Sequence, residues 1–461
     1  MFSVTEIAAA VGGRIVGPSD RTVRGVSTDS RVVAMDELFV PLRGATFDGH
    51  RFLEEVTAKG VRVVLAEERY LKTHPLHADC SCVAVKNSLQ ALGDLAAAYR
   101  RRFSLPVIGV TGSNGKTTTK EMLAAVLART GAGLKTEGNL NNLIGLPRMI
   151  FQLVPEHRWA VLEMGMSEPG EIDRLAEIAL PLVGIVLNAF PAHLASMGSV
   201  EAVARAKGEL LHRIQDNGLA VVNADDPRVA SLPQNSSARR ISFGIRRGEV
   251  RAEGIVSLGL AGQQFQLVTP RGNREITLAA FGSHAVYNAL ATAAALLELV
   301  PLDTIAAGLA DFRPYNGRFQ LETAHALVLI DDSYNANPAS CAAALATLAE
   351  LKDGRQAFVA LGDMLELGAD EVDLHRRLGA QAAQVADRLY LFGDLTAHTA
   401  ETAIAAGMAP DAVVRAPDHD TVIRDILKRA KSGDLVLVKG SRGMNMERIA
   451  HGIRLGGRQE N

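Results

Sequence analysis

The clearest chemistry in this sequence belongs to a glycine-rich segment, GVTGSNGKTT, at residues 109–118. It follows an apolar strand pattern and precedes a helical one, which is the context of a phosphate-binding loop. Glycines let backbone N–H groups turn toward phosphate oxygens, and the helix N-terminus adds positive potential. Lys116 is predicted to reach the β- and γ-phosphates of a nucleotide, and the Thr117 hydroxyl to bind Mg²⁺. The predicted nucleotide-binding residues of this loop are Gly112, Ser113, Asn114, Gly115, Lys116, Thr117 and Thr118.

The segment departs from the strict phosphate-loop pattern at one position. That pattern places a glycine six residues before the lysine, and position 110 is valine. The alternative interpretation is a glycine-rich turn that binds no ligand. A Gly-Lys-Thr-Thr run between a strand and a helix disfavours that alternative, and the sequence predicts a nucleotide site.

Three further polar residues follow the loop where strands are predicted to end. Glu163 closes the apolar pattern of residues 160–163, His193 follows the next strand, and Lys207 lies on a helix predicted to begin near Ser199. Each alone is more typical of a solvated or core residue. The carboxyl ends of parallel strands meet at one edge of a sheet, so the three are predicted to lie near the loop. Glu163 is the candidate for a second metal ligand.

The elements that must position these residues suggest three domains, because 461 residues exceed one core. Residues 1–103 mix short strands with polar turns and end in an alanine-rich helix at 89–102. A Ser-Leu-Pro break then begins residues 104–311, where strands alternate with helices and predict a parallel sheet. Strands are predicted at 38–42, 61–65 and 82–85 in the first domain, and at 107–110, 160–163, 182–187 and 219–223 in the second.

The second predicted domain continues with β-hairpins around residues 250–278 and a buried helix at 282–299. Residues 311–317 are predicted to be a linker. The alternation then restarts, so residues 312–461 are predicted to form a Rossmann-like α/β domain with strands at 327–331, 357–361, 388–392 and 435–438. The fold class is therefore α/β, with a small mixed domain, a central phosphate-loop ATPase domain and a C-terminal α/β domain.

Composition excludes several classes of protein. With 49 Lys and Arg against 51 Asp and Glu, the chain lacks the basic surplus of a non-specific nucleic-acid binder. Three cysteines form too few disulfide bonds to stabilise a chain of this length, so they predict free thiols and a reducing compartment, the cytoplasm. No signal peptide is expected at residues 1–14, which lack a basic region before an apolar run. Residues 178–200 carry no charge, but prolines, asparagine and glycine interrupt them, which predicts a buried strand and a loop instead of a membrane span.

Several segments resemble the Mur ligases, in the order in which that family carries them. The loop TGSNGKTT, with TEGNLNNLIGLP and LEMGMSEPGEI after it, is similar to the central domain of the family. STDSR at 27–31 and LFVPLRGATFDGHRF at 38–52 resemble its N-terminal uridine-nucleotide-binding domain. The remaining similar segments are NADDP at 223–227, GRF at 317–319, DDSYNANPAS at 331–340 and VKGSRGMNMERI at 438–449.

The resemblance implies roles for residues across the chain. Lys207 matches the lysine that the family carbamylates, which would turn an ammonium into a ligand for one of two Mg²⁺ ions. Asn288 matches the asparagine that contacts adenine, although Ala285 replaces the asparagine that often follows His284. The implied catalytic residues are Lys116, Glu163, His193, Lys207 and Arg318, the metal ligands Thr117, Glu163, His193 and Lys207, and the further ATP contacts Asn288, Arg318 and Asp332. The implied substrate-binding residues are Ser27, Thr28, Asp29, Ser30, Arg31, Arg43, Asp48, Asn139, Asn142, Tyr334 and Asn335.

Within the family, the segments are most similar to the branch that adds a dipeptide. The resemblance then implies that a monomeric enzyme uses ATP to join D-alanyl-D-alanine to a UDP-N-acetylmuramoyl-tripeptide, through an acyl phosphate. One alternative is the preceding ligase, which adds the third amino acid and usually shows Asp-Asn-Pro-Arg in its C-terminal domain. The similar string here, at residues 225–228, lies in the central domain. Another alternative is a module that binds partners on ATP hydrolysis, and a third is an α/β assembly without activity.

Overall fold

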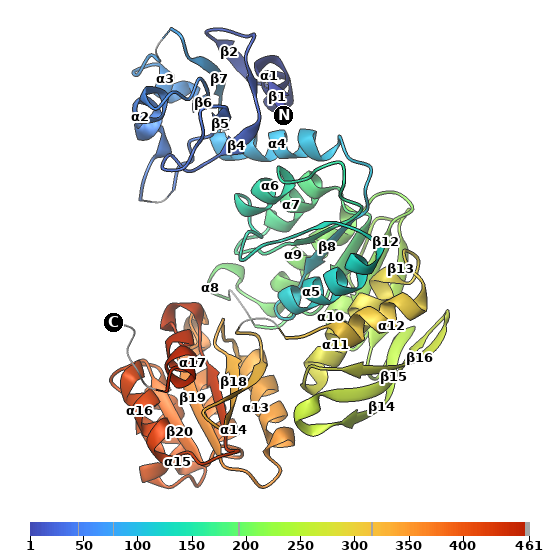
Figure 1. The fold of residues 1–461 in the computed structure, drawn as a ribbon, viewed down its shortest axis with the longest axis vertical. Coiled ribbons are helices and arrows are strands. Elements are labelled where there is room, and N and C mark those ends of the chain that lie inside the picture. Colours follow the sequence, from blue (N-terminus) through green and yellow to red (C-terminus); the bar gives the residue numbers. More distant parts are fainter. Residues whose placement is uncertain (45, 77, 192–193, 315–316, 457–461) are drawn as a thin grey trace.

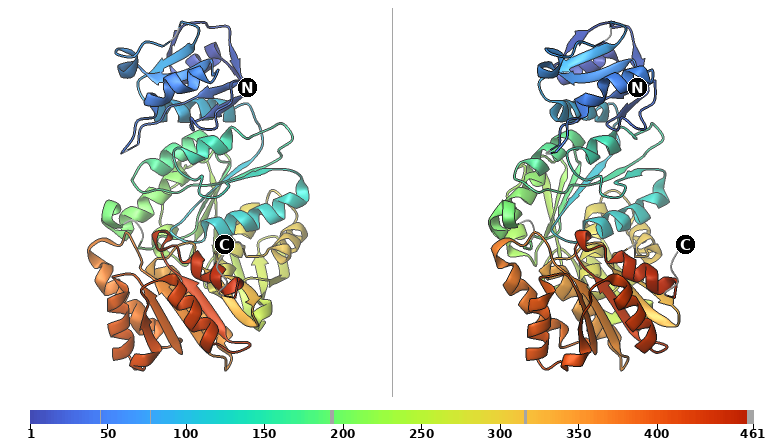
Figure 2. Two further views of the ribbon diagram at one scale, coloured as in Figure 1. Left: turned by 60° about the vertical axis from the view of Figure 1, so that its left-hand side comes forward. Right: turned by 90° about the vertical axis from the view of Figure 1, so that its left-hand side faces the viewer.

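The protein is described by a computed structural model of residues 1–461, except residues 45, 77, 192–193, 315–316 and 457–461. Figure 1 shows three regions along the long axis: an N-terminal one at the top, a central one and a C-terminal one at the bottom. The turned views in Figure 2 also place the central region between the other two. The α/β fold class predicted from the sequence is confirmed.

The N-terminal region contains a mixed five-stranded sheet in the order β2-β7-β6-β5-β4. Its strands are β2 (Arg14–Val16), β4 (Gly25–Ser27), β5 (Glu37–Phe39), β6 (Val63–Glu67) and β7 (Ser81–Val85), and β1 (Phe2–Ser3) pairs with β3 (Thr22–Val23). Its helices are α1 (Val4–Val11), α2 (Leu53–Ala58), α3 (Glu68–Leu71) and α4 (Ser88–Arg100). The predicted strands at 61–65 and 82–85 correspond to β6 and β7, whose residues are all buried.

The central region holds a nine-stranded sheet in the order β16-β15-β14-β13-β12-β11-β8-β10-β9. The strands from β9 to β14 pair in parallel through β8, and the last three are antiparallel, as the hairpin pattern predicted. The bounds are β8 (Val107–Thr111), β9 (Leu134–Lys135), β10 (Ala160–Glu163), β11 (Val183–Val186), β12 (Leu219–Asn223), β13 (Arg239–Gly244), β14 (Val250–Ser257), β15 (Gln263–Thr269) and β16 (Gly272–Leu278).

Helices cover both faces of the parallel part of this sheet (Figure 1). They are α5 (Lys116–Leu127), α6 (Gly145–Ile150), α7 (Glu171–Ala179), α8 (Leu194–Met197), α9 (Val200–His212), α10 (Pro227–Ala230), α11 (Gly282–Leu296) and α12 (Leu302–Asp311). Ser199 caps α9 by accepting a hydrogen bond from the Ala202 amide at 3.1 Å, which fixes the helix start where the sequence predicted it. Strand β8 is central and lies between β10 and β11, so the segments after these three strands converge at one edge.

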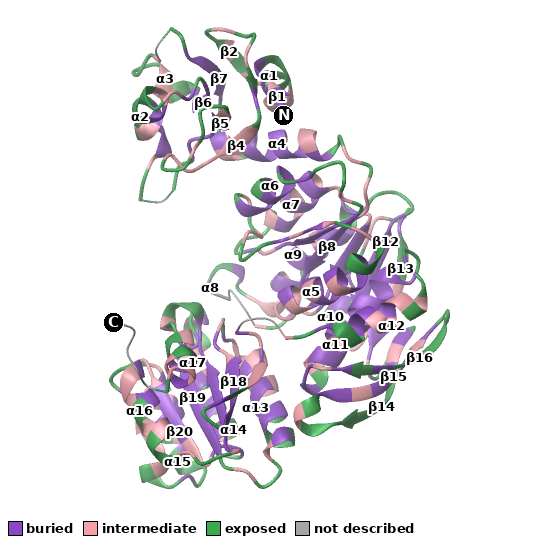
Figure 3. Cartoon of the chain, viewed as in Figure 1, coloured by how far each residue is buried: buried purple, intermediate pink, exposed green. Residues whose placement is uncertain are grey.

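The C-terminal region is a six-stranded sheet in the order β17-β18-β22-β19-β20-β21, parallel except for the edge strand β17. Its strands are β17 (Gln320–Ala324), β18 (Leu327–Asp332), β19 (Ala357–Gly362), β20 (Arg388–Phe392), β21 (Val413–Arg415) and β22 (Leu435–Lys439). Its helices are α13 (Pro338–Lys352), α14 (Glu371–Ala382), α15 (Thr396–Ala405), α16 (His419–Arg429) and α17 (Glu447–Arg454). Buried residues fill the sheet and the inner faces of these helices (Figure 3).

The N-terminal and central regions share one hydrophobic core. Leu92 and Leu95 of α4 belong to the same buried cluster as Met149 of α6 and Leu175 of α7. The buried Arg100 guanidinium ties the end of α4 to this joint by donating hydrogen bonds to three backbone carbonyls, those of Ala179 (2.9 Å), Phe103 (2.6 Å) and Leu105 (3.1 Å). The two clusters of the C-terminal sheet are separate from this core and take from the central region chiefly Phe281, together with the half-buried Leu260.

The three cysteines are free and buried, as the sequence predicted. Burial raises the pKa of the Cys82 thiol to about 12 and that of Cys341 to about 11. The uncharged stretch at 178–200 contains the buried strand β11 and the short helix α8. Among the described residues, no helix combines the length and the apolar character that a membrane crossing requires.

Candidate functional site

The glycine-rich loop lies between β8 and α5, at the converging edge of the central sheet. Gly115 has a φ of +85° at the start of α5, and a Cβ atom there would collide with the Asn288 side chain. Both facts require glycine at this position. The segment after β11 holds the loop from outside, since Asn188 accepts hydrogen bonds from the amides of Ser113 (3.1 Å, carbonyl) and Asn114 (2.9 Å, side chain). The loop is thus preformed for a ligand.

Lys116 lies over this loop, where its ammonium donates a 2.7 Å hydrogen bond to the Gly112 carbonyl. Burial lowers the pKa of Lys116 to about 8, the negative charge of Glu163 opposes the shift, and the nearby Arg318 guanidinium adds to it. A bound phosphate anion would stabilise the charged form of Lys116 and offset the repulsion between Lys116 and Arg318. The lysine is therefore arranged to exchange a backbone carbonyl for a phosphate oxygen.

Glu163 ends β10 directly beside the loop and is buried. Its Oε2 atom accepts a 3.4 Å hydrogen bond from the Thr117 hydroxyl, and its Oε1 atom has no hydrogen-bond partner among the described residues. The Lys120 ammonium lies 3.5 Å from Oε1 and also contacts Glu121 (2.9 Å) and the Thr136 carbonyl (2.8 Å). Lys120 was not predicted, because a lysine on a helix usually lies in solvent.

The arrangement of Thr117 and Glu163 fits a hard divalent cation. Mg²⁺ takes few protein oxygens and completes its shell with phosphate and water, so the Thr117 hydroxyl and a Glu163 carboxylate oxygen without a hydrogen-bond partner among the described residues suit it. Among the described residues, no three side chains of His, Cys, Asp or Glu gather as a metal site of their own. The ion would therefore depend on the nucleotide. His193, a third implied ligand, lies outside the described residues.

Lys207 is buried on α9, one helix away from the loop. Burial holds the pKa of its amine well below the usual value, and the charge of Lys116 lowers it further. A buried lysine with this environment carries a neutral, nucleophilic amine at pH values where an exposed lysine is protonated. The structure thus places Lys207 close enough to Lys116 for the two charges to interact.

Two segments of the C-terminal region contact the loop. Arg318 donates a 3.0 Å hydrogen bond to the Thr117 hydroxyl, and its guanidinium stacks over the Tyr334 ring at 3.9 Å. Asn337 and Asn114 exchange two side-chain hydrogen bonds, of 2.7 and 3.2 Å. Arg318 therefore adds a cation to the loop from the opposite side of the cleft.

Asp332, predicted near the nucleotide, ends β18 on the wall of the same cleft. Its Oδ1 atom accepts a 3.1 Å hydrogen bond from the Phe319 amide, and its Oδ2 atom pairs with the Lys439 ammonium at 2.6 Å. Lys439 was not predicted, although it lies in a segment that carries the family resemblance. Its position at the end of an apolar strand was the available signal, and only the fold shows that the ammonium is buried.

The cleft between the two regions has a volume of about 640 Å³ and is lined by the loop, by α11 and by the segments around Arg318 and Asp332. Asn288 and His284 face it from α11, and burial lowers the pKa of His284. Ala285 packs in the apolar core instead of lining the cleft. Ala285 itself therefore forms no part of the cleft wall.

Most of the predicted substrate-binding residues lie in the N-terminal region. Arg31 makes two hydrogen bonds to Asp29, of 2.9 and 2.6 Å, and holds the pKa of that carboxyl below its usual value. Arg43 pairs with Asp48 at 2.6 Å, and Asp48 also pairs with His50 at 2.6 Å. The rest of this set is Ser27, Thr28 and Ser30, which lie on or directly after the end of β4.

The other predicted substrate-binding residues divide between the cleft and the scaffold. Asn139, Tyr334 and Asn335 line the cleft, and so does Asn141, which was not predicted. The Asn142 side chain does not line the cleft, and its oxygen accepts a 2.8 Å hydrogen bond from the Gly145 amide at the first residue of α6. The string at residues 225–228 also lines the cleft, where Asp226 caps α10 and Arg228 pairs with Glu201 at 2.8 Å.

Three family models match the chain. They are "Mur ligase family, catalytic domain" over residues 22–100, "Mur ligase middle domain" over residues 110–296 and "Mur ligase, glutamate ligase domain" over residues 317–442. Among curated proteins, the UDP-N-acetylmuramoyl-tripeptide–D-alanyl-D-alanine ligase of Bacillus subtilis is 36% identical, with 97% of each chain covered. The Escherichia coli ligase of the same name is 35% identical over 99% of this chain and 100% of its own.

Solved structures of similar chains agree with these matches. A crystal structure of MurF from Acinetobacter baumannii has a TM-score of 0.89 and 32% identity, and covers 98% of this chain and 99% of its own. MurF ligase from Thermotoga maritima, in complex with ADP, has a TM-score of 0.83 and 28% identity, and covers 95% of this chain and 97% of its own. A folylpolyglutamate synthase from Mycobacterium tuberculosis shares the fold at 19% identity and a TM-score of 0.63.

Proposed function

The chain belongs to the Mur ligase family, and from this we propose that it joins D-alanyl-D-alanine to a UDP-N-acetylmuramoyl-tripeptide at the expense of ATP. The products are the UDP-linked pentapeptide used in peptidoglycan synthesis, ADP and phosphate. The curated ligases that carry this name match the chain over nearly its full length. The chain is thus an ATP-dependent ligase that forms a C–N bond.

One structural observation supports this proposal most directly. The phosphate loop of the central region and Arg318 of the C-terminal region meet at the Thr117 hydroxyl, 3.0 Å from the guanidinium. A γ-phosphate bound there lies between Lys116 and Arg318, so that cations from both regions neutralise it. The carboxylate to be activated and the incoming amine can then approach from opposite sides of the cleft.

The reaction proceeds in two displacements. A carboxylate oxygen at the end of the tripeptide attacks the γ-phosphorus, the bond to the β,γ-bridging oxygen breaks, and ADP leaves with that electron pair. The dipeptide amine then attacks the carbonyl carbon of the acyl phosphate, loses a proton, and expels inorganic phosphate. The difficulty of the first step is the repulsion between two anions, which Lys116 and Arg318 reduce while the domains hold the groups in position.

Thr117 and Glu163 are the residues proposed to hold Mg²⁺, with His193 and a carbamate on Lys207 as ligands of a second ion. Bound Mg²⁺ neutralises phosphate charge and polarises the bond to the transferred group. The carbamate proposal is supported by the low pKa of the buried Lys207, because only a neutral amine adds to CO₂. An unmodified ammonium at this position would repel a cation.

The proposed compartment is the cytoplasm, where ATP is available and the three free cysteines stay reduced. The proposed active unit is a monomer. Its support is that one chain supplies the phosphate loop, Arg318 and Asp332, which line the cleft together. A second copy is not needed to build the cleft.

The test supplies purified protein with MgATP, the UDP-linked tripeptide and D-alanyl-D-alanine. We expect ADP and phosphate in equal amounts with a pentapeptide identified by mass spectrometry, and hydroxylamine should trap the acyl phosphate. Lys116→Ala is expected to lower the rate about 10²-fold or more, as for loss of one charge-stabilising group. Exposed Lys428→Ala is the control and should keep the rate.

The rival activities give different results in the same assay. A ligase of the preceding step would use the UDP-linked dipeptide with a free third amino acid and ignore D-alanyl-D-alanine. A module driven by ATP hydrolysis would release ADP equally well without any UDP-linked peptide. A protein without activity would release none. Any of these three results contradicts the proposed reaction.

A further inference from the structure

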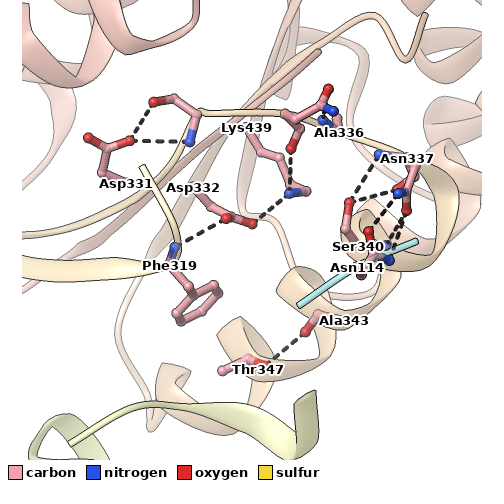
Figure 4. A network of polar contacts seen from close by, with 12 residues as sticks. Asn114, Phe319, Asp331, Asp332, Ala336, Asn337, Ser340, Ala343, Thr347 and Lys439 are labelled. Carbon is pink, nitrogen blue, oxygen red and sulfur yellow. Dashed lines mark hydrogen bonds and ion pairs between the residues drawn. The ribbon is translucent and has the colours of Figure 1, made fainter. Parts of the chain in front are cut away.

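The C-terminal region contacts the phosphate loop through two segments, those of Arg318 and Asn337. A buried ammonium at the end of β22 contacts the bases of both segments. Lys439 is the last residue of this strand, which lies inside the six-stranded sheet, and it is only 2% exposed. Its Nζ atom makes a 2.6 Å ion pair with Asp332 and donates a 3.0 Å hydrogen bond to the Asn335 carbonyl. Figure 4 shows the ammonium next to the Asp332 carboxylate.

The first of the two contacts passes through Asp332. The second oxygen of this carboxylate accepts the 3.1 Å hydrogen bond from the Phe319 amide, next to Arg318 in the chain. Arg318 in turn reaches the Thr117 hydroxyl of the loop. Since Lys439 fixes the carboxylate, it also fixes the backbone from which Arg318 extends.

The second contact passes through the turn before α13. Lys439 holds the carbonyl of Asn335, and two residues later Asn337 both caps α13 and exchanges hydrogen bonds with Asn114 of the loop. Asn114 and Asn337 lie side by side in Figure 4, on the side of the turn away from Asp332. One ammonium therefore supports two separate segments that contact the phosphate loop.

We propose that Lys439 is a positioning residue of the ligase reaction, which braces the Arg318 and Asn337 segments against the phosphate loop through Asp332 and the Asn335 carbonyl. This inference rests on the proposed function. An ion pair in a buried position is costly to leave half-made, because the remaining charge loses its partner without regaining water. Without Lys439, the Asp332 carboxylate should therefore turn toward solvent in the cleft and release the Phe319 amide.

The experiment compares Lys439→Met with Lys439→Arg and with Lys352→Met as a matched control. Lys352, on the same domain and at the end of α13, also pairs with a carboxylate (Asp387, 2.9 Å) and a carbonyl (Val385, 2.9 Å), but it lies away from the cleft. The measured quantities are kcat, the KM for ATP, the KM for the UDP-linked tripeptide, and the affinity for a non-hydrolysable ATP analogue by calorimetry.

We expect Lys439→Met to lower kcat/KM for ATP by about 10- to 100-fold, the range found for groups that orient a functional side chain. The KM for the UDP-linked tripeptide should stay unchanged, because its nucleotide is expected to bind the N-terminal region. Lys439→Arg should recover part of the loss, since the charge remains, and Lys352→Met should behave as the unaltered protein. Equal kinetics for Lys439→Met and Lys352→Met would overturn the proposal.

A double variant separates positioning from folding. Asp332→Asn combined with Lys439→Met leaves no buried charge unpaired, so it should fold even if Lys439→Met alone does not. If Lys439 acts through Asp332, adding Lys439→Met to Asp332→Asn should change kcat/KM little further. If the fold-losses in kcat/KM of the two single variants multiply in the double variant, Lys439 does not act through Asp332. The affinity for the ATP analogue needs no turnover, so it tests the bracing even if the unaltered protein fails to make the pentapeptide.

Discussion

The Lys116 ammonium has a pKa of about 8, because burial disfavours its charged form. Above that pH the free protein loses the proton, whereas bound phosphates favour the charged form. Nucleotide binding should therefore take up a proton above pH 8, and ATP affinity should fall by up to about tenfold per pH unit there. Calorimetry between pH 7.5 and 9.5, in two buffers of different ionisation enthalpy, measures both effects.

Lys116→Arg provides the control for this prediction. A guanidinium stays charged over the whole range, so the variant should bind ATP with an affinity that does not change with pH. If the unaltered protein and Lys116→Arg show the same pH dependence, the titrating group is elsewhere and the role given to Lys116 is wrong.

Lys207 yields a second prediction at the level of a single residue. Its low pKa leaves a neutral amine that can add CO₂, and lower pH should protonate it and oppose carbamate formation. Activity should therefore fall in buffers stripped of CO₂ and return on addition of bicarbonate, with one added CO₂ in the mass of the native protein. Lys207→Arg should lose about 10²-fold or more, as for loss of a group that stabilises charge, and should not respond to bicarbonate.

The exposed Lys59→Arg variant serves as the comparison for Lys207→Arg. It should keep both the full rate and the response to bicarbonate. A protein that works equally well with and without CO₂ would show that the Lys207 amine acts unmodified.

At the scale of elements, the turn from β8 into α5 depends on the φ of +85° at Gly115. An alanine there is strained by roughly 1 kcal/mol and in addition meets the Asn288 side chain. Gly115→Ala should therefore weaken ATP binding strongly. Gly354→Ala is the matched control, because Gly354 has a φ of +75° and open space around its Cβ position. It should lower thermal stability slightly and leave ATP affinity unchanged.

The strand–loop–helix elements were predictable because long apolar runs and a glycine-rich turn carry strong local signals. The parallel strands β8, β10, β11 and β12 could be expected from the α/β alternation, and Glu163 from its place at a strand end. Their order in the sheet, β12-β11-β8-β10, could not. The strands β1 to β4 were missed, since two or three residues show no periodicity. The antiparallel edge strand β17 was also missed, because its five residues do not alternate clearly between apolar and polar types.

The site itself was only partly predictable. Lys120 and Lys439 are buried through contacts that form after folding, with Glu163 in one case and Asp332 in the other. A lysine in a helix or strand pattern gives no sign of such a partner. Asn142 accepts a hydrogen bond from the Gly145 amide at the start of α6, and its role in substrate binding stays a prediction. Local sequence predicts which residue types are present, whereas distant pairing decides what each does.

At the scale of the whole molecule, the two joints between regions differ in kind. The N-terminal and central regions share a continuous apolar core, whereas the C-terminal region meets the loop through polar contacts such as Asn114 with Asn337. Calorimetry should therefore show the first two regions unfolding together and the C-terminal region in a separate transition. A single unfolding transition, in the unaltered protein and in every variant, would contradict this.

Arg100 allows this prediction to be sharpened. Its guanidinium donates hydrogen bonds to three carbonyls at the first joint, so Arg100→Leu should destabilise the shared transition by about 3 kcal/mol. The transition of the C-terminal region should keep its midpoint. Exposed Arg101→Leu, on the next residue, is the control and should leave both transitions in place.

The burial of the three native thiols has a practical consequence for measuring the distance between the central and C-terminal regions. At neutral pH they are buried and protonated, with pKa values of about 12 for Cys82 and about 11 for Cys341. Maleimide dyes should therefore react first with cysteines introduced at exposed positions, such as Val154 (42% exposed) in the central region and Asp373 (side chain 69% exposed) in the C-terminal one. Fluorescence transfer between such a pair can report the distance between the regions while every native cysteine stays in place.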